Sequence, residues 1–163
     1  MNEENRRIFW ERLRELCRRP ELIPLRTSPQ HRGNTTFQHS VNVAIYSFYL
    51  SEKWGWKVDI PSMVRGALLH DFALSNSGHG AYGHNHRTVC HPKLSLKRAQ
   101  LYFDLNAVER SIILSHMWPT PGSPMPRTKE AILVNLADKH CASVEMHHGW
   151  RQIPIPKLIQ PIE

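Results

Sequence analysis

Histidine and aspartate side chains recur in this sequence on or beside apolar segments with helical spacing, where ionisable groups are unusual. They are His39, His70, Asp71, His91, His116 and Asp138. Burying an unpaired carboxylate is costly, so an aspartate that ends the apolar segment at 132–138 needs a partner, and a metal cation is one such partner. A metal site built from these residues is therefore one expectation.

Imidazole and carboxylate groups suit Fe, Mn, Co, Ni or Zn ions. Mg²⁺ prefers more oxygen ligands than this set offers, although it can occupy one of two sites. Two ions held by histidine nitrogens and a bridging carboxylate would produce a metal-bound hydroxide at neutral pH and could clamp the oxygens of a phosphoryl group. The chemistry expected of such a site is hydrolysis.

Each of these residues also has a purely structural interpretation. A single histidine on a helix is more often a buried core residue than a ligand. Asp138 could instead form a buried salt bridge with Lys139 or Arg127. The order of the residues favours the metal site: a His, a His-Asp pair, two further His and a final Asp lie on or beside different predicted helices.

This order resembles the HD superfamily of metal-dependent phosphohydrolases. The similarity covers about residues 34–145, and the matching motifs are residues 37–40 (Phe-Gln-His-Ser), 66–71 (Gly-Ala-Leu-Leu-His-Asp), 91–92 (His-Pro), 113–116 (Ile-Leu-Ser-His) and 136–139 (Leu-Ala-Asp-Lys). The resemblance implies a first metal ion held by His39, His70, Asp71 and Asp138. In members with the longer motif, the aspartate that matches Asp71 bridges to a second ion, which the residues matching His91 and His116 bind. The resemblance therefore implies a binuclear site.

The resemblance also implies an enzyme that hydrolyses a phosphate ester of a small phosphorylated molecule or a nucleotide through a metal-bound hydroxide. A net charge of +7, from 21 Lys and Arg against 14 Asp and Glu, agrees with an anionic substrate. The residues expected to take part in the chemistry are Asp71, His86, Lys93 and Lys139. The lysines would hold phosphate as point charges, and His86 would protonate the leaving oxygen. Arg32 and Arg87 are further candidates for holding phosphate.

Two other classes of function stay open. An HD-type di-iron oxygenase would use the same six ligands to cleave a C–C or C–P bond, and the redox behaviour of the metal distinguishes it from a hydrolase. A non-catalytic nucleic-acid-binding module would use the arginine-rich first helix. The sequence contains no nucleic-acid-binding motif and little interleaving of aromatic with basic residues, which disfavours the module.

Helices must position these residues, because apolar side chains recur at helical spacing in five or six segments and no alternating strand pattern is found. We predict an all-α, single-domain HD-type bundle of five to six core helices. The predicted helices cover about residues 3–18, 36–53, 60–71, 92–103, 107–116 and 129–144, capped by Thr35 or Thr36, Asp59, Asn106 and Thr128. Residues 20–35, 75–90 and 119–126 are predicted to be loops, since they contain most of the glycines and prolines.

We predict three parts of the chain: an N-terminal helix and loop at 1–33, the HD domain at 34–148, and an extended, proline-containing tail at 149–163. Three cysteines without a CxxC motif argue against a disulfide framework and a cysteine zinc site. The charged N-terminus lacks a signal core, and no apolar stretch approaches the ~20 residues of a membrane helix. A cytoplasmic protein without a membrane partner is expected, and the sequence indicates no oligomeric state.

Overall fold

The computed structural model describes residues 2–30, 33–73 and 84–148, without the side chains of residues 84–90 and 148. These parts of the chain are mostly helical. The helices are α1 (Glu3–Cys17), α2 (Ile23–Thr27), α3 (Thr36–Trp54), α4 (Ile60–Leu69), α5 (His84–Ala99), α6 (Ala107–Ser115) and α7 (Lys129–His148), with a 3-10 turn η1 (Pro20–Leu22). Within the described residues, the β pairing is limited to one isolated bridge between Pro29 and Thr35. The predicted all-α fold is confirmed.

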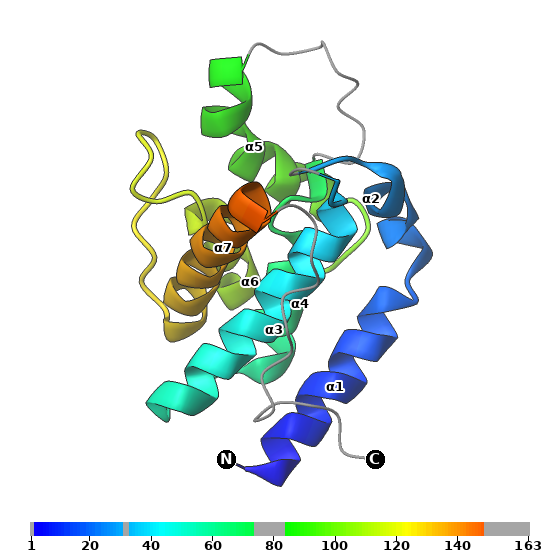
Figure 1. The fold of residues 1–163 in the computed structure, drawn as a ribbon, viewed down its shortest axis with the longest axis vertical. Helices are drawn as coiled ribbons and strands as arrows, with labels where there is room; N and C mark the ends of the chain where they lie inside the picture. The colour runs from blue at the N-terminus through cyan, green and yellow to red at the C-terminus, as the bar shows by residue number, and fades with distance from the viewer. Residues whose placement is uncertain (1, 31–32, 74–83, 149–163) are drawn as a thin grey trace.

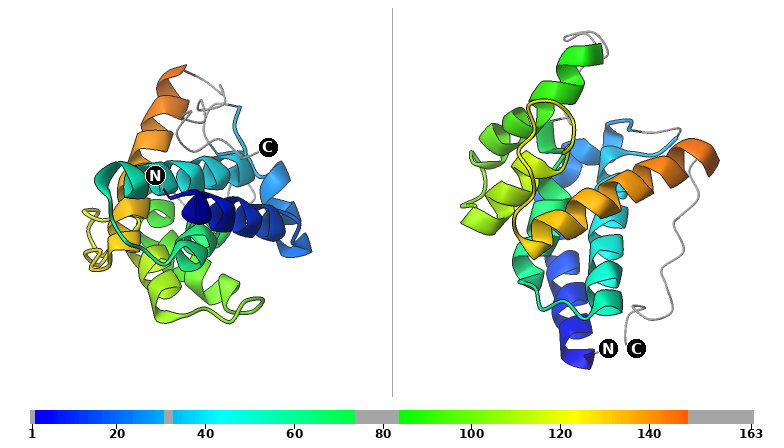
Figure 2. Two further views of the ribbon diagram at one scale, coloured as in Figure 1. Left: turned by 90° about the horizontal axis from the view of Figure 1, so that it is seen from below. Right: turned by 90° about the vertical axis from the view of Figure 1, so that its left-hand side faces the viewer.

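Four helices form the centre of the molecule. α3 packs against α4 and α7, and α6 packs against the same two helices, so the four enclose a common core. α1 lies against α4, and α5 lies against α6 at one end of the molecule (Figure 1). α7 packs across α3 at an angle, as the right-hand view of Figure 2 shows. The core is filled by large side chains that are fully buried, such as Phe48, Met63, Leu68, Ile113 and Leu133.

Local capping explains where the central helices begin. Thr35 forms a capping box with Gln38 at the start of α3, and Asn106 forms one with Glu109 at the start of α6. The side chain of Asp59 accepts a hydrogen bond from the backbone at the start of α4. Each cap satisfies backbone N–H groups that have no partner within the helix. The predictions of these caps from the sequence are confirmed.

Three predicted boundaries are wrong. The predicted loop at 20–35 contains η1 and α2, each with a proline in its first turn, where a missing N–H costs nothing. α5 begins at His84 and ends at Ala99, so Pro92 lies inside the helix rather than at its start, and the predicted loop at 75–90 is helical from residue 84. α7 continues to His148, four residues beyond the predicted end. The predicted extended tail at 149–163 lies outside the described residues.

α1 packs on the bundle through aromatic side chains and is lined on its outer side by ion pairs. The ring of Phe9 stacks on Phe48 of α3, with 4.3 Å between ring centroids. Arg7 pairs with two glutamates of its own helix, and Arg12 pairs with Glu15. These arginines are therefore balanced locally, which weakens the case for an open cationic stripe that reads nucleic acid. No helix in the described parts of the chain has the length and apolar character needed to span a membrane.

Candidate metal centre

The six His and Asp side chains singled out in the sequence come together in the core. α3 provides His39, α5 provides His91 and α7 provides Asp138, while His70, Asp71 and His116 directly follow the last residues of α4 and α6. None of the six is more than 9% exposed. Their candidate ligand atoms form three overlapping groups, in each of which all the atoms lie within 4.8 Å of one another: His39, His70 and Asp71; His70, His116 and Asp138; and Asp71, His91 and His116.

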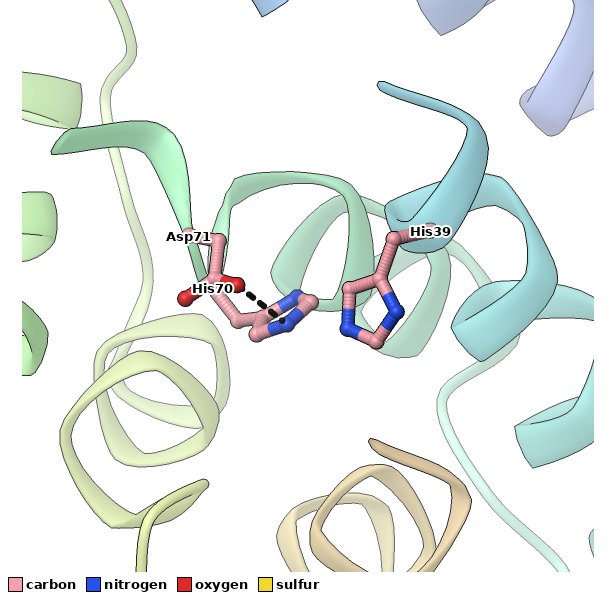
Figure 3. Close-up of side chains that lie close together, drawn as sticks. All are labelled: His39, His70 and Asp71. Carbon is pink, nitrogen blue, oxygen red and sulfur yellow. Dashed lines mark ion pairs between the residues drawn. The ribbon is translucent and has the colours of Figure 1, made fainter. Parts of the chain in front are cut away.

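The first set of contacts joins α3, α4 and α7. Nε2 of His39 lies 3.0 Å from Oδ1 of Asp138. Nε2 of His70 lies 3.6 Å from the same oxygen and 3.4 Å from Oδ2 of Asp71. Figure 3 shows the ring of His39 extending from α3 toward the ring of His70, with the ion pair between His70 and Asp71 as a dashed line. Two imidazoles and two carboxylates thus converge at one place.

The second set of contacts lies on the other oxygen of Asp71. Its Oδ1 atom is 3.2 Å from Nε2 of His91 and 3.5 Å from Nε2 of His116. The Nε2 atoms of His91 and His116 are 2.7 Å from each other. Asp71 therefore presents one oxygen to His70 and the other to His91 and His116, which is the arrangement that a carboxylate shared between two ions requires.

His70 and His116 are oriented by the same local device. Each occupies the C-cap position of its helix, where backbone carbonyls lack an N–H partner within the helix. Nδ1 of His70 lies 2.7 Å from the carbonyl oxygen of Ala67, and Nδ1 of His116 lies 2.8 Å from that of Ile113. A carbonyl only accepts, so Nδ1 donates the proton in both residues. Nε2 of each ring therefore lies on the side of the other site residues, and it carries the lone pair when the ring is neutral. Burial lowers the pKa of His70, but the neighbouring carboxylates of Asp71 and Asp138 outweigh it and raise this pKa well above its usual value, so a cation at Nε2 would replace a proton there.

His39 lies between two carboxylates of α7. Nδ1 is 2.9 Å from Oε2 of Glu145, and Nε2 is 3.0 Å from Oδ1 of Asp138. Burial alone lowers the pKa of His39, but the hydrogen bonds with Asp138 and Glu145 outweigh it and raise this pKa to about 9. Burial also opposes ionisation of Asp138, yet its hydrogen bond with His39 and its contact with His70 hold its pKa well below the usual range. A cation at Nε2 would replace the proton there, because metal ions and protons compete for the same lone pair.

The residues present fit a metal ion. Nε2 of His70 and Oδ1 of Asp71 are buried and have no hydrogen-bond partner within the described parts of the chain. Buried polar atoms of native proteins are rarely left in this state, and a bound metal ion would satisfy both. Burial lowers the pKa of His116, which keeps the ring neutral, as a ligand must be. Burial opposes ionisation of Asp71, but His70 and the other two histidines hold its pKa well below normal.

Two side chains at this centre were not predicted from the sequence. Glu145 is 1% exposed and contacts His39, as described above. Gln30 donates a hydrogen bond of 2.7 Å from Nε2 to Oδ2 of Asp71, from the segment between α2 and α3. Glu145 lies about two helical turns after Asp138, a spacing that would have placed both carboxylates on one face of α7. No comparable sequence signal marks Gln30.

The other residues predicted to act in catalysis have no described contact with the side chains of the six site residues. Lys139 follows Asp138 on α7, and its Nζ donates to the carbonyl oxygen of His116 at 3.2 Å. Lys93 is exposed on α5, two residues after His91. The side chains of His86 and Arg87, as well as all of Arg32, lie outside the described residues. The catalytic roles of these residues stay predictions.

The comparison with protein families gives one match. The HD domain model matches residues 36–143, about two thirds of the chain, and this range contains all six site residues. No curated protein and no solved structure matches the chain. HD domains bind divalent metal ions, which agrees with the buried His and Asp groups found here.

Proposed function

The chain belongs to the HD domain family, and from that premise we propose that it is a metal-dependent phosphohydrolase acting on a small phosphorylated molecule or a nucleotide. One observation supports this most directly. The two oxygens of Asp71 face different histidines, Oδ2 toward His70 and Oδ1 toward His91 and His116. This arrangement suits two ions that share a carboxylate, and paired ions are a common means of stabilising an in-line displacement at phosphorus.

The side chains of the centre would divide into two groups of ligands. His39, His70 and Asp138 would hold one ion, His91 and His116 the other, and Asp71 would belong to both. Divalent cations bound there would lower the pKa of a water molecule and neutralise charge on the phosphoryl oxygens. The protein's own contribution is to hold the Nε2 atoms of the histidines and the ionised carboxylates in place before the substrate arrives, so that little reorganisation is needed during the reaction.

Cationic side chains around the centre support an anionic substrate. The Nζ atom of Lys139 lies beside the backbone of His116. Its hydrogen bonds there are to two neutral carbonyl oxygens, so the charge of the ammonium group is not neutralised by these contacts. An ammonium group can hold a phosphoryl oxygen as a point charge. We propose that Lys139, with Lys93 on α5, contributes to binding the phosphate group.

The test begins with metal analysis of freshly purified protein. The protein is then depleted of metal and reloaded separately with Mn²⁺, Co²⁺, Zn²⁺ or Fe²⁺. Each form is assayed for phosphate or alcohol release on a panel of phosphomonoesters, nucleotides, phosphodiesters and phosphonates, with oxygen present and with oxygen removed. Asp71→Asn provides the inactive reference, because it removes the charge of the shared carboxylate.

We expect hydrolysis of at least one class of phosphate ester, with equal rates in the presence and absence of oxygen and with activity in a redox-inert metal such as Zn²⁺. Turnover that occurs only with iron and oxygen would contradict hydrolysis and indicate the di-iron oxygenase instead. A protein that retains no metal and turns over no compound of the panel would contradict both enzymatic proposals.

A further inference from the structure

Glu145 is a buried carboxylate on α7 that belongs to neither group of candidate ligands. It is 1% exposed, and its Oε2 atom is 2.9 Å from Nδ1 of His39. Its other oxygen, Oε1, accepts a hydrogen bond of 3.0 Å from the side-chain amide of Asn42. Asn42 lies on α3, the helix that provides His39. Glu145 therefore binds α3 at two points and has a fixed position beside the His39 ring.

The contacts of Glu145 determine how His39 presents its second nitrogen. An ionised carboxylate only accepts, so Nδ1 of His39 carries a proton and donates to Glu145. The other oxygen of Glu145 accepts from Asn42, so both oxygens of the carboxylate act as acceptors. Nε2 then faces Asp138 and the other site residues. His70 and His116 obtain the same orientation from backbone carbonyls, whereas His39 lies within α3 and depends on a side chain for it.

We propose that Glu145 is a positioning residue that fixes the tautomer and ring orientation of His39 and so strengthens metal binding at the group formed by His39, His70 and Asp138. The inference rests on the proposed metal-dependent function. A carboxylate behind a metal-binding histidine raises the basicity of the ring and prevents its rotation, and loss of such a partner typically lowers metal affinity about 10- to 100-fold. Glu145 itself would not touch the ion or the substrate.

The test compares metal binding in three variants with Co²⁺ as the probe. Glu145→Ala removes the acceptor. Glu145→Gln keeps an oxygen that accepts from Nδ1 of His39, but it removes the charge. The side-chain amide of Asn42 can rotate so that its oxygen accepts from the new amide NH2 group. Glu109→Gln is the matched control, because Glu109 is also a 1% exposed carboxylate, but it pairs with Arg65 away from the site. Metal-depleted protein is titrated with Co²⁺ and followed by visible absorption and calorimetry, and unfolding curves establish that each variant is folded.

We expect Glu145→Ala to weaken one of the two Co²⁺ binding steps about 10- to 100-fold and to change the visible spectrum of that ion, with the other step nearly unchanged. Glu145→Gln should lose clearly less affinity than Glu145→Ala. Glu109→Gln should lower stability without changing either step. Equal Co²⁺ affinity in wild type and Glu145→Ala would overturn the inference, and so would an equal loss in Glu109→Gln.

The two proposals fail in different ways. A wild-type protein that binds Co²⁺ with the expected dependence on Glu145, but hydrolyses no phosphate ester, would contradict the proposed reaction and leave the role of Glu145 supported. A wild-type protein that binds no Co²⁺ would contradict both. If Glu145→Ala does not fold, the comparison of Glu145→Gln with Glu109→Gln decides: a loss of Co²⁺ affinity confined to Glu145→Gln supports the inference, and its absence overturns it.

Discussion

Gly66 of α4 lies against Ile112 of α6 so closely that a Cβ atom on Gly66 would come within 2.6 Å of Cδ1 of Ile112. Gly66 is one helical turn before His70, and Ile112 is one turn before His116. The rings of these two histidines are 4.9 Å apart between centroids. The close approach of the two helices at Gly66 therefore sets the distance between two candidate metal ligands, and a side chain at this position would alter both packing and site geometry.

Gly66→Ala should destabilise the protein. Alanine favours a helix over glycine by about 1 kcal/mol, but overpacking a filled core typically costs about 1–3 kcal/mol. Rotation of the Ile112 side chain would relieve the 2.6 Å contact with Cδ1, but Cβ of Ile112, at 3.0 Å, moves only with the backbone of α6, so the steric cost should prevail. We expect a net loss of about 1–2 kcal/mol in the free energy of unfolding, measured by urea denaturation, together with weaker Co²⁺ binding.

The control for Gly66→Ala removes the atom of Ile112 that the new Cβ atom would approach most closely. Ile112→Val deletes Cδ1, and alone it should cost about 0.5–1.5 kcal/mol. In the Gly66→Ala background the same change should cost less or restore stability, because it makes room for the new methyl group. Additive effects of the two substitutions in this double-mutant cycle would show that the contact with Cδ1 of Ile112 is not the source of the loss.

Asp71 should matter more to metal content than either outer histidine. Its two oxygens face separate groups of side chains, so Asp71→Ala should abolish turnover and lower the content of both metal ions. His116→Ala should mainly reduce the ion bound by His91 and His116, with the other retained. Elemental analysis of the purified variants gives the metal content. Full metal content and full activity in the Asp71→Ala protein would exclude the bridging role.

Gln30 should help to hold Asp71 in its bridging orientation. Its Nε2 atom donates to Oδ2 of Asp71, and its Oε1 atom accepts from the hydroxyl of Thr36, so both ends of the amide are fixed. Gln30→Ala should lower Co²⁺ affinity by about tenfold, in the range for lost outer partners of metal ligands. Gln38→Ala provides the comparison, because it removes a glutamine of the α3 capping box away from Asp71. A similar loss of affinity in both variants would assign the effect to general destabilisation.

The sequence predicted features that depend on neighbouring residues and missed those that depend on distant ones. The caps of α3 and α6 involve partners three residues away, and a cap was predicted at each place, at Thr35 or Thr36 and at Asn106. Glu145 contacts His39, which lies 106 positions away in the sequence, and Gln30 contacts Asp71, which lies 41 positions away. No local pattern marks such pairs. The sequence of the first turns of α5 lacks an apolar stripe and so predicts a helix start at Pro92, whereas the helix begins eight residues earlier, at His84.

Lys139 should affect substrate binding more than the rate at which the bound substrate is hydrolysed. It directly follows Asp138, and its ammonium group lies 3.2 Å from the carbonyl oxygen of His116. Lys139→Met keeps a side chain of similar length without the charge. With a phosphate ester that the wild type hydrolyses, we expect KM to rise about tenfold and kcat to change little, the pattern of a lost contact made equally in ground and transition states.

The end of α6 should survive the Lys139→Met substitution, because the side-chain amide of Asn135 also donates to the carbonyl oxygens of Ser115, His116 and Trp118. Lys129→Met is the matched control, since Lys129 is an exposed lysine in the first turn of the same helix. Its KM should equal that of the wild type, and the fold and metal content of both variants should be unchanged. An unchanged KM in Lys139→Met, or an equal rise in Lys129→Met, would exclude Lys139 from phosphate binding.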